Sequence, residues 1–180
     1  SYSGDGTLRI WNGNDGSILH TLKAHTSWVR GVELLSDGRI LSYSDDKTLR
    51  IWNGNDGSIL HTLAGHTYGV LGVEVLADGR ILSYSGNPYE DTGDTTLRIW
   101  NGNDGSLIHT LEGHTYGVLG VEMLSDGRIL SYSKDKTLRI WNGNDGSLLY
   151  TLQGHTKSIG GVELLSEGRI LSYSWDNTLR

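Results

Sequence analysis

Apolar residues along this chain fall in short runs that are separated by turn-forming residues. Val29 to Leu35 is one such run; it ends at the turn Ser36-Asp37-Gly38, and Ile40 to Ser44 follows. Leu49 to Trp52 comes next, and Ser58 to Leu63 follows a further glycine-rich turn. Runs of four to seven residues between Gly, Asp and Asn turns predict β-strands, and they leave no room for long helices. The pattern therefore predicts an all-β unit of four antiparallel strands.

This unit recurs along the chain. The tripeptide Ser-Tyr-Ser begins at residues 1, 42, 83, 131 and 172, so the steps are 41, 41, 48 and 41 residues. The long step is one unit plus seven inserted residues (48 minus 41), and the last nine residues, SYSWDNTLR, repeat the first nine, SYSGDGTLR. A four-stranded meander cannot bury both of its faces alone, so radially stacked copies are expected, as in the blades of a β-propeller.

We expect a single domain over residues 1–180 with four blade-equivalents. The first and last blade segments are partial and complementary, because the chain begins within a second strand and ends within a third strand. The expected blade segments are 1–22, 23–63, 64–111, 112–152 and 153–180.

Composition narrows the classes of function. The formal charge is −6 with acids and bases spread evenly, so no basic stripe indicates nucleic acid as a partner. Cysteine is absent, which excludes disulfides and thiolate metal sites, and no apolar run approaches the roughly 18 residues of a membrane span. We expect no cofactor, no metal, no nucleic acid and no membrane as partners. The cellular location stays open, with a slight preference for the cytoplasm.

The units share a Gly-His or Ala-His dipeptide, an apolar strand, Asp-Gly-Arg, a serine-rich strand, Asp-x-Thr and a strand ending in tryptophan. This combination resembles the WD40 repeat over essentially the whole chain. The resemblance implies a β-propeller that acts as a non-catalytic scaffold for protein or peptide binding on the rim around the central channel. The alternative is a self-assembling structural or engineered propeller fragment, since near-identical repeats indicate recent amplification or engineering.

The resemblance also implies a hydrogen-bonded tetrad in each blade. An indole N–H only donates and a carboxylate only accepts, whereas histidine and serine do both, so a closed relay satisfies every buried polar group. A His-Ser-Asp set could also indicate a catalytic triad, but identical copies in every blade favour a structural role, and no enzyme is expected. The expected sets are His25, Ser42, Asp46 and Trp52; His66, Ser83, Asp94 and Trp100; His114, Ser131, Asp135 and Trp141; and His155, Ser172 and Asp176 without a tryptophan.

Three forms of ring closure are open at this point. The ends of one chain could meet in a four-bladed ring, two chains could form an eight-bladed homodimer, or the chain could be a piece of a longer repeat protein. A four-bladed ring needs a much steeper wedge between blades, so the homodimer is favoured. In it, Trp11 of one chain would join His155 and Asp176 of the other. Only one of the two SYSxDxTLR copies at each junction could then occupy the blade.

Positions that differ between the repeats are candidates for partner binding. They follow the tetrad histidine or precede the tetrad aspartate, and in WD40 proteins such positions lie on the rim. Trp, Tyr and Arg are common hot-spot residues, whereas neutral drift on an exposed rim is the alternative. The candidates are Trp28, Arg30, Tyr68, Tyr89, Tyr116, Lys134, Lys157 and Trp175. Tyr89 belongs to the insertion at 86–93, which is interpreted as tolerated in preference to a cation site.

Other repeated residues are expected to be structural. Glutamates of the innermost strand, such as Glu33 and Glu74, could form an acidic ring, but pairs with arginines are favoured. The outer-strand histidines His20, His61 and His109 occur once per blade, which is too regular for a chelate, and are expected on the surface. The stretch RIWNGNDGS occurs four times and is expected to form hairpins, because Asn-Gly and Asp-Gly supply positive φ angles.

Overall fold

The structure is a computed structural model that describes residues 1–87 and 93–180. Tyr89 and the middle of the insertion therefore lie outside the described residues. The described residues form five antiparallel sheets that follow one another along the chain. The predicted all-β class and the four-stranded antiparallel unit are confirmed.

Three of the sheets have four strands each, paired in chain order. The first strands of neighbouring sheets contact one another and form the inner edge of the stack, so the fourth strand is the outer one. The strands of these three sheets are β3 (Val29–Leu34), β4 (Ile40–Ser44), β5 (Thr48–Trp52) and β6 (Ile59–Ala64); β7 (Val70–Val75), β8 (Ile81–Ser85), β9 (Leu97–Trp100) and β10 (Leu107–Leu111); and β11 (Val118–Met123), β12 (Ile129–Ser133), β13 (Leu138–Trp141) and β14 (Leu148–Leu152).

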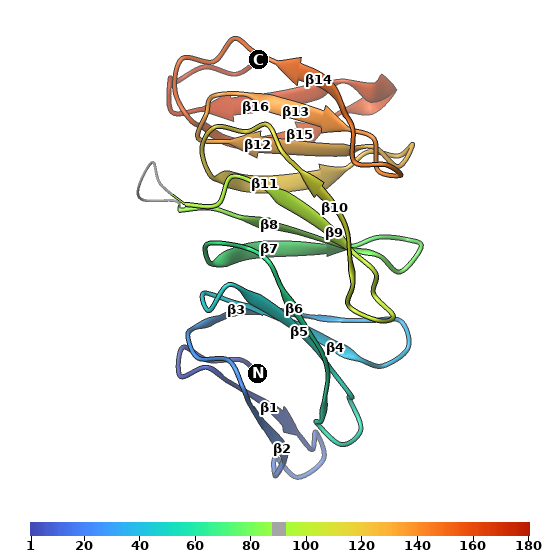
Figure 1. Cartoon of the computed structure of the whole chain (residues 1–180). Coiled ribbons are helices and arrows are strands. Elements are labelled where there is room, and N and C mark those ends of the chain that lie inside the picture. The colour runs from blue at the N-terminus through green and yellow to red at the C-terminus, as the bar shows by residue number, and fades with distance from the viewer. Residues whose placement is uncertain (88–92) are drawn as a thin grey trace.

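The two terminal sheets have two strands each. The first pairs β1 (Thr7–Trp11) with β2 (Ile18–Lys23), and the last pairs β15 (Ile159–Leu164) with β16 (Ile170–Ser174). A short 3-10 helix, Ser166–Gly168, lies between β15 and β16. Figure 1 shows the five sheets as one curved stack with the two terminal sheets at opposite ends, so the described residues form an open array and not a closed four-bladed ring.

The core lies between neighbouring sheets. Leu41, Leu49 and Leu63 of the β3–β6 sheet cluster with Ile81 and Trp100 of the next sheet, and all five are at most 1% exposed. The same arrangement recurs one interface later, where Trp141 packs with residues of the β7–β10 sheet. Trp52, Trp100 and Trp141 each insert into the sheet that precedes their own, and apolar burial between sheets holds the stack together.

The tyrosine of each second strand lies across a glycine of the paired first strand. Tyr84 on β8 is paired with Gly72 on β7, and a Cβ atom at Gly72 would overlap the Tyr84 hydroxyl. Burial, with nearby tyrosines and glutamates, raises the pKa of Tyr84. The bulky residue fits because the opposite strand carries no side chain there. The equivalent pairs are Gly31 with Tyr43, Gly120 with Tyr132 and Gly161 with Tyr173.

The RIWNGNDGS stretches form the expected hairpins between third and outer strands. Gly57 has a φ of 73°, as the prediction for Asp-Gly requires, but Gly54 is not in the left-handed region. The expectation for Asn-Gly is therefore wrong. Gly54 instead approaches the carbonyl of Gly38 so closely that a Cβ atom would overlap it. Gly57 packs against the preceding sheet, because its Cβ position lies 3.3 Å from that of His20.

Candidate functional site

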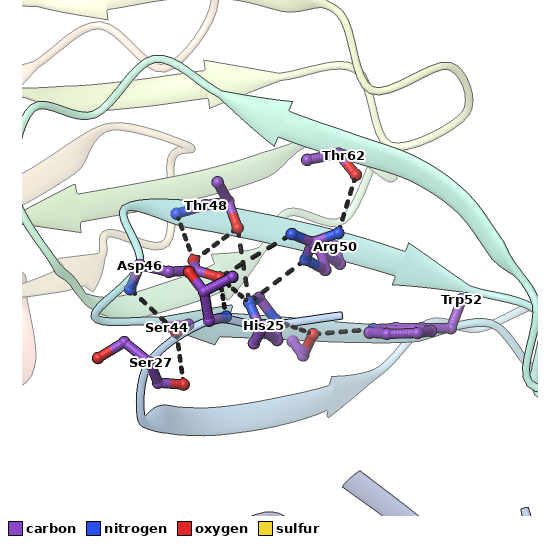
Figure 2. Close-up of polar contacts among 10 residues, drawn as sticks. His25, Ser27, Ser44, Asp46, Thr48, Arg50, Trp52 and Thr62 are labelled. Carbon is purple, nitrogen blue, oxygen red and sulfur yellow. Dashed lines mark hydrogen bonds and ion pairs between the residues drawn. The ribbon is translucent and has the colours of Figure 1, made fainter. Parts of the chain in front are cut away.

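The first complete histidine network lies within the β3–β6 sheet (Figure 2). His25 precedes β3, Ser42 lies on β4, Asp46 follows β4 and Trp52 ends β5. The His25 Nδ1 atom is 2.8 Å from Asp46 Oδ2, and Nε2 is 2.7 Å from Ser42 Oγ. The Trp52 indole N–H donates to Ser42 Oγ at 2.8 Å. Four residues from four places in the sequence therefore share one chain of hydrogen bonds.

Only one assignment of the protons gives every hydrogen bond of this network a donor and an acceptor. An ionised Asp46 can only accept, so Nδ1 of His25 carries the proton and Nε2 accepts from the Ser42 hydroxyl. The serine oxygen in turn accepts from the indole. Thr48 Oγ1 at 2.6 Å and the Thr26 backbone N–H at 3.0 Å also donate to the Asp46 carboxylate. Every polar atom of the network has a partner, which is what burial requires.

Two further sheets carry the same network at nearly the same distances. In the β7–β10 sheet, His66 lies 2.8 Å from both Asp94 and Ser83, and Trp100 donates to Ser83 at 2.8 Å. In the β11–β14 sheet the corresponding distances are 2.7 Å from His114 to Asp135, 2.8 Å from His114 to Ser131 and 2.8 Å from Trp141 to Ser131.

The last sheet carries three of the four residues. His155 lies 3.0 Å from Asp176 and 2.9 Å from Ser172. Trp11, the tryptophan expected to join them from another copy, is in the first sheet, where it is 44% exposed and donates to Ser1 Oγ at 3.0 Å. A single chain does not bring Trp11 to His155, because their sheets lie at opposite ends of the stack (Figure 1).

The three complete networks have the bonding order of a nucleophilic triad but no access for a substrate. Ser42, Ser83 and Ser131 are 0% exposed, and each hydroxyl oxygen is bonded to an indole N–H. A nucleophile must approach the electrophilic carbon of a substrate, which a fully buried oxygen cannot do. The chemistry that this arrangement supports is therefore the satisfaction of buried polar groups.

The aspartates of the networks are held in the ionised form. Burial alone would raise the pKa of Asp135, but hydrogen bonds from His114 and Thr137 outweigh it and lower the pKa to about 2. The pKa values of Asp46 and Asp94 are lowered in the same way, against burial, by their histidine and threonine partners. Burial, opposed by Asp46, also lowers the pKa of His25.

We expect the free energy of unfolding to fall as the pH drops from about 4 to about 2. Asp135 has a lower pKa in the folded chain than its ordinary value of 3.8, so its stabilisation is complete above that value and is lost as pH falls through about 2. Complete loss corresponds to about 2 kcal/mol. Urea unfolding between pH 2 and 7 measures the change, and Asp135→Asn should lack this part of it. A midpoint that does not move below pH 4 would contradict the expectation.

The structure brings some of the predicted rim residues together. A cavity of about 230 Å³ between the β3–β6 and β7–β10 sheets is lined by Arg30 and Tyr68. Arg30 Nε donates to Asp45 Oδ1 at 2.7 Å, and its guanidinium lies 6.0 Å from the ring of Trp28, which is 61% exposed. The other described candidates lie on other blades: Tyr116, Lys134, Lys157 and Trp175. Tyr89 lies outside the described residues.

Sequence reasoning missed three residues that also line this cavity, namely Asp45, Lys47 and Asn87. Asn87 donates from Nδ2 to the Tyr68 hydroxyl at 3.0 Å, which holds the phenol at the cavity wall. Asp45 could have been found from the sequence, because its position varies between the repeats as those of the chosen candidates do. Asn87 carries no repeat signal, since it belongs to the insertion.

The expected glutamate–arginine pairs are wrong for the described residues. Arg39 instead pairs with Asp37 at 2.7 Å, two residues earlier in the turn, and its Nη1 donates to the carbonyl of Gly102 in the next sheet at 2.6 Å. Asp37 binds the Arg39 guanidinium because it lies in the same turn, closer to the arginine than the glutamates of the first strands. Glu74 has its pKa raised by burial and by Glu122 and Glu33, so glutamates of adjacent inner strands repel one another.

The outer-strand histidines are not simple surface residues. His20, His61 and His109 are half-buried, and each packs against the hairpin glycine of the following sheet. His109 Nε2 also lies 3.1 Å from the carbonyl oxygen of Asn144. Among residues 1–87 and 93–180, no group of three His, Cys, Asp or Glu side chains could hold a metal ion. No helix in the described part of the chain has the length and apolarity to cross a membrane.

Comparison with known proteins gives a family match over most of the chain. The WD40 family model, described as WD domain, G-beta repeat, matches residues 16–53, 57–101, 105–142 and 146–180. Ribosome assembly protein 4 of Chaetomium thermophilum is 51% identical over 39 residues, which are 22% of this chain and 8% of that protein. Nuclear distribution protein PAC1 of Arthroderma benhamiae is 51% identical over 41 residues, 23% of this chain and 9% of that protein. The matched part is less than a tenth of each relative.

Two solved structures share the fold over nearly all of this chain. The WD40 β-propeller domain of Doa1 is 30% identical, with a TM-score of 0.74, and the alignment covers 99% of this chain and 58% of that one. The computationally designed Ika8 protein is 22% identical, with a TM-score of 0.80, and the alignment covers 99% of this chain and 52% of that one. In both cases the stack of sheets described above corresponds to about half of the longer chain.

Proposed function

This chain belongs to the WD40-repeat family, and from that premise we propose that it is a non-catalytic scaffold that binds a short protein or peptide segment on its rim. The cavity between the β3–β6 and β7–β10 sheets carries the proposal. It combines the charged groups of Arg30, Asp45 and Lys47 with the phenol of Tyr68. A concave site with a few convergent polar groups and an aromatic wall is the usual form of a binding site.

The residues around this cavity suit recognition of a side chain from a partner. Tyr68 is 38% exposed, and Trp28 presents most of its indole to solvent beside the Arg30 guanidinium. Trp, Tyr and Arg are the residue types that most often dominate binding energy. The rigid aromatic side chains among them bury a large area at a small entropic cost. The sheets behind them are fixed by the interlocking cores, so the rim is held before a partner arrives.

The histidine networks support the non-catalytic part of the proposal. We assign them a structural role in each blade, in which they satisfy buried polar groups at the same place in successive sheets. Their serine oxygens are buried against an indole in the three complete copies. The names of the relatives, ribosome assembly protein 4 and nuclear distribution protein PAC1, do not describe an enzyme.

The rim proposal predicts that binding depends on Tyr68 and Trp28. A peptide array identifies binding segments, and titration calorimetry with the strongest of them measures the affinity. Tyr68→Ala or Trp28→Ala is expected to weaken binding at least about tenfold, as for hot-spot residues. Tyr150→Ala is the matched control, because Tyr150 is 60% exposed on the outer strand β14, away from the cavity. Equal affinities for all variants would overturn the rim site.

Self-assembly is a second candidate function, and the two terminal sheets favour it. The first contains a third and an outer strand, β1 and β2, and the last contains a first and a second strand, β15 and β16. Two copies would thus supply a complete four-stranded blade at each junction, eight blades in all. The alignment with Ika8 covers 52% of that chain, so two copies have about its length. Light scattering should give twice the chain mass of 19.7 kDa, and a mass of one chain excludes the ring.

A further inference from the structure

We infer that the first RIWNGNDGS loop, residues 9–17, is a docking element for a second copy of this chain. Its receptor is the cavity beside His155 at the opposite end of the stack. The inference rests on the self-assembly candidate and names the contacts that would close the ring. Three independent features support it: the residues that line the cavity, the exposure of Trp11 and the contacts that interior loops make but this loop lacks.

The receptor cavity has the lining of a tryptophan site. It has a volume of about 140 Å³, and its walls include Leu138, Leu152 and Ile170 together with His155 and Ser172. One interface earlier, the repeat equivalents of the three apolar residues pack around Trp141. Those equivalents are Leu97, Leu111 and Ile129. The cavity therefore lies where an indole would reach Ser172, as Trp141 reaches Ser131.

Trp11 is the tryptophan that fits this cavity. It is 44% exposed, whereas Trp52, Trp100 and Trp141 are each 1% exposed. Its N–H donates to Ser1 Oγ, and Ser1 is the repeat equivalent of the tetrad serines. In the free chain Trp11 therefore makes the serine bond of a tetrad without a histidine. The Ser172 and His155 pair of a second copy offers the same bond in an apolar pocket.

The glycines of the first loop have space that the interior loops lack. Gly54 approaches the Gly38 carbonyl so closely that a Cβ atom would overlap it, and the later copies do the same. Gly13, the equivalent of Gly54, has no atom within 4 Å of its Cβ position. By repeat equivalence, the carbonyl that Gly13 would meet in a closed ring belongs to Gly168 of the second copy. A Cβ atom at residue 13 is thus harmless in one chain and obstructive in the ring.

An arginine contact between sheets completes the pattern. Arg39 donates to the carbonyl of Gly102 at 2.6 Å, and Arg80 donates to that of Gly143 at 2.7 Å. Each arginine thereby bonds the loop of the following sheet. Within the described residues, the side chain of the next arginine, Arg128, bonds Asp126 and no loop of another sheet. The equivalent acceptor for Arg128 is the carbonyl of Gly13 in a second copy.

Closure of the ring requires both ends of the chain to release a short segment. Tyr2 bridges Leu8 at one end, and Tyr173 bridges Leu179 at the other, so each copy of the duplicated segment folds back on its own sheet. In the closed ring, Leu8 of one chain would pair with Tyr173 of the other. The C-terminal copy then supplies the second strand and the N-terminal copy the third. Each copy of the duplicated segment therefore contributes one of the two strands that the segment spans. This refines the expectation that one whole copy is displaced.

The test compares the mass in solution of four variants with that of the unaltered chain over a range of concentrations. The unaltered chain should have the mass of two chains, and Trp11→Ala and Gly13→Ala should weaken the dimer at least tenfold. Ile108→Ala and Asn14→Ala are controls that remove an exposed apolar side chain on β10 of the central sheet and a neighbouring loop side chain, and both should remain dimeric. Circular dichroism should be unchanged, because Trp11 is exposed and Gly13 has space within one chain.

The outcomes separate this inference from the candidate function beneath it. A mass of one chain for the unaltered protein at every concentration overturns both. A dimer that Trp11→Ala and Gly13→Ala leave intact supports self-assembly but overturns the docking assignment. Equal weakening by the two control variants also overturns it, because the effect would not be specific to the loop contacts.

Discussion

Replacing Trp100 with alanine is expected to lower the free energy of unfolding by about 4 kcal/mol, as for other buried large aromatic residues. The indole is 1% exposed and packs between two sheets with Leu41, Leu49 and Leu63. Its removal leaves a cavity at that interface and takes the indole donor away from Ser83. Since most domains are stable by only about 5–15 kcal/mol, this change should shift the urea midpoint strongly.

Trp28→Ala is the matched control for this prediction. The residue type is the same, but Trp28 is 61% exposed. Its ring makes a cation–π contact with the Arg30 guanidinium, which lies 6.0 Å from the ring centroid. Its loss should cost less than about 1 kcal/mol, the size of an exposed cation–π contact. Urea unfolding of both variants, followed by circular dichroism, measures the difference. Similar losses in the two variants would show that burial at the sheet interface is not what stabilises the stack.

Replacing Gly72 with alanine is expected to destabilise the chain by about 3 kcal/mol, at the upper end of the usual cost of overpacking. The new methyl group would overlap the hydroxyl and ring of Tyr84. Tyr84 cannot move aside easily, because its ring packs against the buried cluster between the second and third complete sheets. Either the ring leaves its place or the two strands separate.

A second substitution tests this explanation. In the double variant Gly72→Ala with Tyr84→Ala, the clash is absent, so the total loss of stability should be clearly smaller than the sum of the two single losses. Contacting residues in such cycles typically couple by about 0.5–3 kcal/mol. Additive losses would mean that the backbone at residue 72 requires glycine for a reason other than the space that Tyr84 occupies. Thermal or urea unfolding of the three variants decides between the two.

The strands could be predicted from local periodicity, and the histidine networks from the resemblance of each unit to the WD40 repeat. Alternation along β4 places Ser42 and Ser44 on the same face of the strand, and the repeat sets His25 at the same offset before every first strand. The observed strand β4, Ile40–Ser44, has the predicted limits. Where every copy has the same four residues, one network implies the others.

Contacts between sheets could not be predicted in this way. Arg39 and the carbonyl of Gly102 are 63 residues apart, and they meet only because consecutive sheets stack with a fixed offset. The same stacking places Gly57 against His20. The expected glutamate–arginine pairs failed for a local reason, because Asp37 lies two residues before Arg39 in the same turn and binds its guanidinium. A period in the sequence specifies which face of a strand is buried. The distance and rotation between neighbouring faces come from how side chains interlock across them, and that depends on the whole stack.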